Sequence, residues 1–241
     1  MSETDRVDPR LVAHRGITFS IDDASAPVEN TVEALVAAAD FGCAAVEFDV
    51  HATADGVWVM HHDPTLERIC AVDRAIADTD LATLRRETAK TRAPLATLAE
   101  ALAALPVGCR PMVEVKPTTA AHFDALARDL ADAARLDPIV IVRGALPSAA
   151  AAAFPGVPIF LFEEDWDAAF ARRDEPLAGY DLRHDPVDEA EIAAECARFA
   201  EAGKEIAVWT IDDPPRAWRW LDAGAPWVIT NRVDRVMAAR G

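Results

Sequence analysis

Short apolar segments alternate along the chain with longer, alanine-rich segments whose apolar residues recur at helical spacing. Most of the short segments are continuously apolar rather than alternating, which is typical of parallel strands that are buried on both faces. They predict nine β-strands, over residues 10–14, 44–50, 57–61, 111–116, 138–143, 157–162, 178–183, 205–210 and 226–230.

The longer segments predict helices between these strands. Their ends carry helix signals: Gly42 follows the first helix, Asp188 is a suitable N-cap for the fourth, and Pro214 opens the last. The predicted helices cover residues 31–41, 95–105, 119–135, 188–202 and 214–223.

A strand followed by a helix, repeated about eight times in 241 residues, predicts a closed (β/α)₈ TIM barrel. A doubly wound open sheet is the alternative. The barrel is favoured because no G-x-G-x-x-G turn opens the first helix and because polar residues follow strands along the whole chain. We expect one domain over residues 10–241, a disordered tail over residues 1–9, and a short excursion at residues 63–94, after the second strand.

The formal net charge of −17 narrows the range of partners. So acidic a surface repels nucleic-acid backbones and anionic lipids, so neither nucleic-acid binding nor stable membrane association is expected. No apolar run approaches the roughly 18–20 residues of a membrane span, and the polar N-terminus is unlike a secretory signal, so a cytoplasmic location is expected. The four scattered cysteines are predicted to be small buried hydrophobic residues.

Acidic residues end two of the predicted strands. Glu47 and Asp49 are two positions apart and therefore face the same side, and Glu114 lies near the end of the next barrel strand. Three converging carboxylates repel one another unless a cation lies among them, and carboxylate oxygens suit a hard divalent ion such as Mg²⁺ or Ca²⁺. The alternative is that one of these acids pairs with an arginine of a helix.

Histidines and cations follow other strand ends. His14 and His62 are the candidate acid–base pair, since an imidazole gains or loses a proton near neutral pH. Arg15 and Lys116 supply positive charge that suits a phosphate group, although Lys116 also has the alternative role of neutralising Glu114. Trp209 is a candidate for packing against the carbon part of a substrate. The other four histidines have a weaker case, and of these only His51 and His61 lie close enough in the sequence for a supporting role.

Taken in order, these residues resemble the glycerophosphodiester phosphodiesterase family. The resemblance runs from about residue 11 to residue 235, and the ordered set is far more specific than any one part. Its parts are His14-Arg15-Gly16, Glu29-Asn30-Thr31, Glu47-x-Asp49-Val50, Thr53-x-Asp55-Gly56, His62-Asp63-x-x-Leu66-x-Arg68, Glu114-x-Lys116, Val208-Trp209-Thr210 and Ile229-Thr230.

This resemblance implies a TIM barrel that hydrolyses glycerophosphodiesters to glycerol 3-phosphate and an alcohol. It implies one divalent cation on Glu47, Asp49 and Glu114, catalysis by His14 and His62, and a phosphate near Arg15 and Lys116. Related barrels let a substrate hydroxyl attack phosphorus first, which gives a cyclic phosphate. Two other functions are considered: phospholipase D or lyase-like action on lysolipids, and a non-catalytic binding barrel.

The chain departs from the family pattern in three places. Its Pro-Glu-Asn-Thr is interrupted as Pro27-Val28-Glu29-Asn30-Thr31, which leaves the roles of Glu29 and Asn30 open. The segment between Arg68 and Pro94 is short, which predicts looser enclosure of the substrate. The usual Thr-Asp near the C-terminus is Thr230-Asn231, which is predicted to alter only a turn. The headgroup, the identity of the metal and the oligomeric state are left open.

Overall fold

Eight parallel strands form a closed barrel in the computed structural model, which describes residues 7–18, 26–116 and 120–240. Each strand pairs with the next, and the last pairs with the first, so the (β/α)₈ prediction is confirmed and the open sheet is excluded. The strands are β1 (Leu11–His14), β2 (Ala45–Ala52), β4 (Arg110–Val115), β5 (Ile139–Val142), β6 (Ile159–Glu163), β7 (Gly179–Arg183), β8 (Glu205–Trp209) and β9 (Trp227–Thr230).

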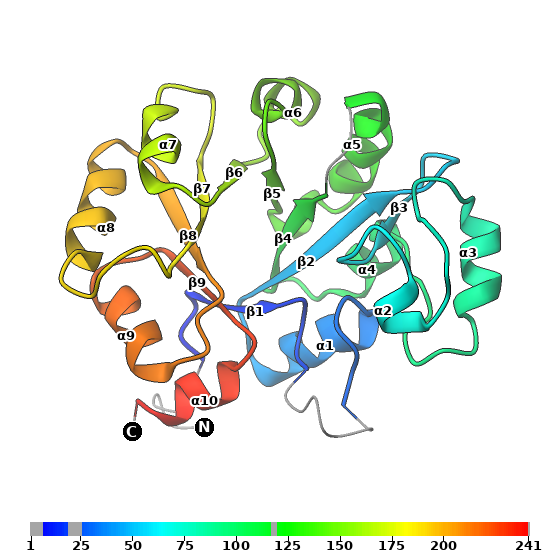
Figure 1. Cartoon of the computed structure of the whole chain (residues 1–241), viewed down its shortest axis with the longest axis horizontal. Helices are drawn as coiled ribbons and strands as arrows, with labels where there is room; N and C mark the ends of the chain where they lie inside the picture. Colours follow the sequence, from blue (N-terminus) through cyan, green and yellow to red (C-terminus); the bar gives the residue numbers. More distant parts are fainter. Residues whose placement is uncertain (1–6, 19–25, 117–119, 241) are drawn as a thin grey trace.

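Helices surround the strands (Figure 1). The first begins after Thr31, whose side chain accepts a hydrogen bond from the backbone N–H of Ala34, and ends at Gly42 with φ 102°. The helices of the barrel are α1 (Val32–Phe41), α4 (Leu98–Ala104), α5 (Phe123–Asp132), α6 (Pro147–Ala153), α7 (Trp166–Ala171), α8 (Ile192–Glu201), α9 (Pro214–Asp222) and α10 (Val233–Ala238).

Two predicted helices differ most from those observed. The segment predicted over residues 119–135 contains α5 between two short 3₁₀ turns, Ala120–His122 and Ala134–Leu136. The helix predicted from Asp188 begins at Ile192, because residues 188–191 form a turn in which Glu191 N–H donates to the carbonyl oxygen of Asp188. Both differences concern helix ends, where a short turn competes with the first or last helical turn.

Apolar residues fill both sides of the barrel wall. An inner cluster lies inside the barrel, and the alternate residues of the same strands pack outward against the helices. Burial on both faces explains why the strands are continuously apolar in sequence. The inner cluster consists of Val12, Ala45, Met112, Ile139, Ile141, Phe160, Ala207 and Ile229.

The excursion after β2 has a small core of its own. Its first strand, β3 (Trp58–Met60), runs antiparallel to the end of β2, so the strand predicted at 57–61 exists but is not a barrel strand. Two short helices, α2 (Glu67–Cys70) and α3 (Leu81–Thr88), follow it. Leu66 and Ile76 are among the residues that pack with Val59 in this third apolar cluster, which fixes the excursion beside the barrel.

The chain before β1 is partly described. Residues 1–6 of the predicted tail lie outside the described residues, whereas Asp8 is buried and accepts hydrogen bonds from Arg10 and Arg240. All four cysteines are buried free thiols, as predicted. Across the described ranges, every helix is too short or too polar to cross a bilayer.

Gly16 links the end of β1 to helix α1. Its φ is +84°, and a Cβ added there would lie 2.6 Å from the carbonyl carbon of Ala34 and 2.7 Å from the Cβ of that residue. We expect Gly16→Ala to destabilise the fold by about 3 kcal/mol, because the left-handed backbone and the overlap both oppose a side chain. The measurement is the free energy of unfolding in urea.

Gly108 provides the matched control. It also has a positive φ, 102°, but an added Cβ meets nothing within 4 Å. Gly108→Ala should therefore cost only the backbone contribution of about 1–2 kcal/mol. Equal losses in the two variants would show that close packing of Gly16 on α1 is not what requires glycine.

Candidate active site

The three predicted acids meet at the carboxyl end of the barrel. Glu47 and Asp49 lie on β2, and Glu114 lies opposite Asp49 on the neighbouring strand β4. All three are buried, and one carboxylate oxygen from each lies within 4.8 Å of the others. The parallel register therefore brings together the residues that the sequence places 65 positions apart.

Positive side chains surround two of these acids. Lys116 Nζ lies 2.5 Å from Asp49 Oδ1 and 2.9 Å from Glu114 Oε1. Arg143 donates two hydrogen bonds to Glu114 Oε1, at 2.9 and 2.7 Å, and Arg15 Nε lies 3.3 Å from Asp49 Oδ2. Although burial opposes ionisation, Lys116 and Arg15 hold the pKa of Asp49 well below its usual range.

Glu47 lacks comparable compensation. Its Oε2 accepts a hydrogen bond from the backbone N–H of Arg15 at 3.1 Å and lies 3.8 Å from His14 Nε2. Burial, together with repulsion from Asp49 and Glu114, raises the pKa of Glu47 well above its usual range. A divalent cation among the three acids would supply the missing charge, and the all-oxygen donor set fits Mg²⁺ or Ca²⁺.

The loop before α1 supports Asp49 and Arg15. Asn30, with φ 54°, donates from Nδ2 to Asp49 Oδ2 at 2.8 Å and accepts from the backbone N–H of Asp49 at 2.9 Å. Glu29 accepts hydrogen bonds from Arg15 Nη1, at 2.9 Å, and from Arg68. The interrupted Pro-Val-Glu-Asn-Thr sequence thus still places Glu29 and Asn30 against the site.

His14, at the end of β1, is held by a chain of hydrogen bonds. Asn231 Nδ2 donates to Asp212 Oδ2 at 2.9 Å, and its Oδ1 lies 2.7 Å from His14 Nδ1. Because a carboxylate only accepts, the amide oxygen must face the ring, so Nδ1 of His14 carries the proton and Nε2 is an acceptor. Burial, and then the charge of Arg15, lower the pKa of His14 to about 4, so the ring is neutral at neutral pH.

This contact corrects one expectation from the sequence. Asn231 was predicted to alter only a turn, but it lies directly against a candidate catalytic ring. The available signal was its position: it follows the last barrel strand, where polar side chains reach the mouth of a TIM barrel.

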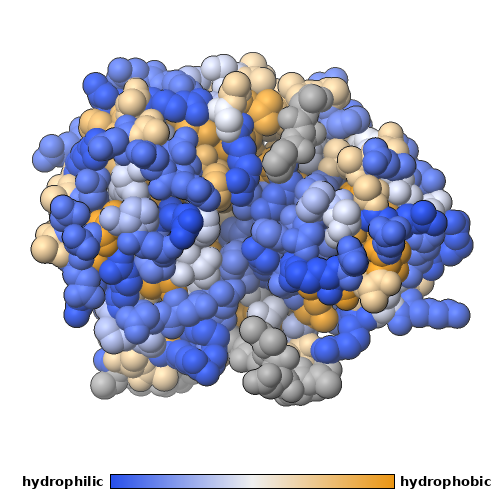
Figure 2. All heavy atoms as spheres, in the orientation of Figure 1, coloured by the Kyte–Doolittle hydropathy of each residue, from blue (hydrophilic) through white to orange (hydrophobic). Residues whose placement is uncertain are grey.

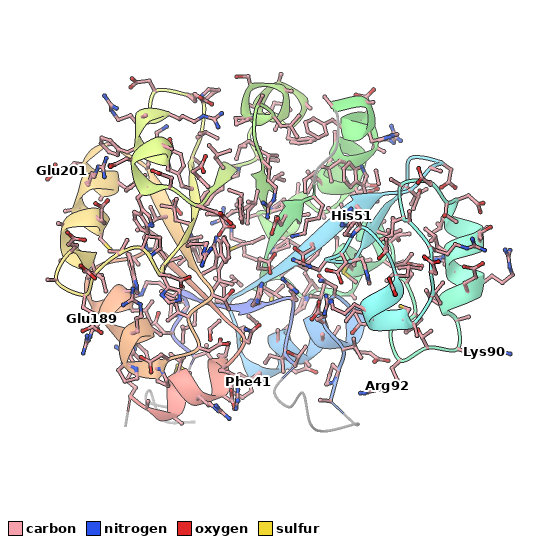
Figure 3. The ribbon with its side chains drawn as sticks, viewed as in Figure 1. Phe41, His51, Lys90, Arg92, Glu189 and Glu201 are labelled. Carbon is pink, nitrogen blue, oxygen red and sulfur yellow. The ribbon has the colours of Figure 1, made fainter. Side chains whose placement is uncertain are left out.

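His62 reaches the site from the loop that follows β3. Its Nδ1 lies 2.7 Å from Asp63 Oδ1, and Arg68 Nε donates to the other oxygen of that carboxylate at 2.5 Å. Although burial opposes ionisation of Asp63, its hydrogen bonds with Arg68 and His62 lower its pKa to about 2. His51, labelled in Figure 3, lies on β2, and its Nε2 is 3.0 Å from the carbonyl oxygen of His62, which gives it a supporting contact.

The remaining histidines lie outside this arrangement. His61 is buried with Nε2 3.0 Å from the carbonyl oxygen of Thr65, so it supports the loop that carries His62. His184 contacts Arg216, and His122 contacts Trp58 through its carbonyl oxygen. None of the three lines the cavity described next.

A cavity of about 230 Å³ connects these groups at the barrel mouth. One wall is aromatic: the rings of Phe162 and Trp209 stack with centroids 5.0 Å apart, and the Arg143 guanidinium lies 3.3 Å above the Phe162 ring. The predicted residues on its lining are His14, Arg15, Glu47, His62, Glu114, Lys116 and Trp209, while Arg143, Phe162, Glu164, Asp181, Thr210 and Ile229 also line it.

The family model of the glycerophosphoryl diester phosphodiesterase family matches residues 14–235, nearly the whole chain. The chain belongs to this family. The match includes every predicted site residue, from His14 on β1 to Trp209 on β8, and also Asn231, which follows β9.

Known proteins agree with this family assignment. The chain is 26% identical to "Probable glycerophosphodiester phosphodiesterase 2" of Mycobacterium tuberculosis, over 95% of this chain and 91% of that protein. It is 42% identical over 62 residues to a glycerophosphocholine phosphodiesterase of Candida albicans, a match that spans 25% of this chain and only 5% of the fungal protein. Its fold is similar to that of an Oleispira antarctica phosphodiesterase solved with sn-glycerol-3-phosphate, with a TM-score of 0.79, 24% identity and 96% of both chains covered.

The hydrogen-bond chain behind His14 predicts a single tautomer. ¹⁵N NMR of the histidine rings should show His14 neutral and protonated on Nδ1, and Asn231→Leu should give a mixture of tautomers because the amide acceptor is gone. The ring of His122 is the internal control and should not change. A His14 ring protonated on Nε2, or one unaffected by Asn231→Leu, would contradict this arrangement.

Proposed function

We propose that the protein hydrolyses glycerophosphodiesters to sn-glycerol 3-phosphate and an alcohol, with one divalent cation, Mg²⁺ or Ca²⁺, held by Glu47, Asp49 and Glu114. The observation that carries the proposal is that two histidines with different Nδ1 partners face one cavity that also contains converging acids. Family membership supports the substrate class. The charged lining does not suit the acyl chain of a lysolipid, and a mere binding barrel needs no pair of proton carriers.

Positive charge in the cavity favours a phosphate group despite the acidic chain. Arg15, Lys116 and Arg143 all line the cavity, and each also contacts at least one of the three acids. Their charges therefore serve both the carboxylates and an incoming phosphodiester. When bound, a divalent cation would withdraw negative charge from the phosphoryl oxygens.

The two histidines have different proton roles in this proposal. His14 is neutral with Nε2 as an acceptor, so it removes the proton from the attacking hydroxyl, either of water or of the substrate itself, as the new P–O bond forms. His62 Nδ1 lies against the ionised carboxylate of Asp63, which orients the ring, and Nε2–H of His62 gives a proton to the departing alkoxide as the old P–O bond breaks. One proton is taken and one is given, which returns the pair to its starting state after exchange with solvent.

We also propose where the protein acts and what it binds. A cytoplasmic location is consistent with the four free thiols, and the expected partner is a small phosphodiester rather than a macromolecule. The visible face in Figure 2 is mostly hydrophilic, with apolar atoms in small separate patches. That surface does not favour a broad protein-docking function.

The histidine variants test this proposal. With a panel of glycerophosphodiesters, the wild-type protein should release sn-glycerol 3-phosphate, lose activity with a chelator, and recover it with Mg²⁺ or Ca²⁺. His14→Ala and His62→Ala should each lower kcat by about 10²–10⁴-fold, the contribution of one acid–base group.

His122→Ala is the matched control, since this histidine does not line the cavity and should leave kcat unchanged. Wild-type rates in both active-site variants would overturn the proposed roles. Release of the alcohol without sn-glycerol 3-phosphate would instead indicate the phospholipase D-like reaction.

A further inference from the structure

Asp181 lies at the floor of the cavity and has no role in the reaction described above. It is the third residue of β7 and pairs in register with Phe162 of β6 and Ala207 of β8. Its exposed fraction is 3%, yet it lines the cavity. It therefore places a carboxyl group between the apolar interior of the barrel and the space left for a substrate.

One oxygen of this carboxyl group lacks a protein partner in the part of the chain that is described. Its Oδ1 is fully buried and accepts no hydrogen bond there. Two cations that line the same cavity are already engaged: Lys116 contacts Asp49 and Glu114, and Arg143 contacts Glu114. A buried polar group without a partner destabilises a fold, so its presence at a cavity floor indicates that a ligand completes it.

The surroundings define which ligand group fits. Burial, and then repulsion from Glu114, raise the pKa of Asp181 well above its usual range and so favour its protonated form. A protonated carboxyl group both donates and accepts a hydrogen bond, which suits a hydroxyl group. The stacked rings of Phe162 and Trp209 line the same cavity and offer an apolar surface for the carbon atoms that bear such a hydroxyl.

We infer that Asp181 forms a hydrogen bond to a hydroxyl group of the glycerol moiety and so determines specificity for glycerol-containing phosphodiesters. This inference rests on the proposed function and adds a recognition residue to it. Glycerol carries two free hydroxyls in every such substrate, whereas the leaving alcohol varies, so a fixed buried acid is better matched to the glycerol side. A site built to bind a hydroxyl rejects analogues that lack it.

Ligand binding tests this without requiring turnover. The dissociation constants of sn-glycerol 3-phosphate and of propyl phosphate, which lacks both hydroxyls, are measured by calorimetry for wild type, Asp181→Asn and Asp181→Leu. Asp181→Leu should weaken binding of sn-glycerol 3-phosphate by about 10–100-fold and leave propyl phosphate within about threefold, whereas Asp181→Asn, which keeps a donor and an acceptor, should retain most of the affinity.

Tyr180→Phe is the matched control. Tyr180 precedes Asp181 on β7 and also has a buried oxygen without a partner among the described residues, but it packs outward against Phe199. Its removal should change neither dissociation constant. Asp181→Leu should also raise Tm, since it removes a buried polar group without a partner, and this shift reports on the folded variant independently of binding.

The failure of this inference is distinguishable from failure of the proposed function. If Asp181→Leu weakens both ligands equally, or neither, while the wild type still hydrolyses glycerophosphodiesters, the inference alone is overturned. If the wild type neither hydrolyses these substrates nor binds sn-glycerol 3-phosphate, the proposed function fails first.

Discussion

The carboxylates of Glu47, Asp49 and Glu114 are buried together at the barrel mouth, where their mutual repulsion must be balanced by positive charge. Three cationic side chains supply part of that charge: Lys116 contacts two of the acids, and Arg15 and Arg143 contact one each. The compensation is incomplete at Glu47, whose pKa is raised by burial and by the other acids. A cluster of buried charges contributes little to the stability of the fold. Its properties are those of a binding site for a cation and an anionic substrate.

The barrel also makes its two histidines different. His14 lies at the end of β1 and contacts the uncharged amide of Asn231, and this hydrogen bond connects the first strand to the end of the last. His62 comes from the excursion, where a carboxylate held by Arg68 supports it. Closure of the barrel and the antiparallel strand β3 therefore bring two unlike proton carriers to one cavity, although both residues belong to the same type.

The sequence predicts the strands well because burial on both faces leaves continuous apolar runs that few other structures explain. It also places the three acids, because the register of parallel strands aligns their carboxyl ends. Strand direction is harder to predict: residues 57–61 contain β3, and only its pairing with β2 shows that it runs antiparallel. Helix starts such as Ile192 depend on local turns that composition does not determine.

The residues that sequence reasoning missed are single polar side chains at strand ends. Arg143 follows an apolar run and Asp181 interrupts one. Neither can be told from other charged residues until the positions of the neighbouring strands are known. Asn231 was noticed as a departure from the family pattern, but its contact with His14 spans 217 positions of sequence. The contact of Asn231 with His14 follows from barrel closure, and the contact of Arg143 with Glu114 follows from the pairing of β5 with β4. Neither is encoded in a local sequence pattern.

The most direct test of the central claim is a crystal structure of the protein soaked in Mn²⁺, with anomalous diffraction used to locate the ion. We expect one peak at the barrel mouth, with an oxygen of each of Glu47, Asp49 and Glu114 at roughly 2.0–2.6 Å. No peak there, with Lys116 and Arg143 still paired to Asp49 and Glu114, would contradict it.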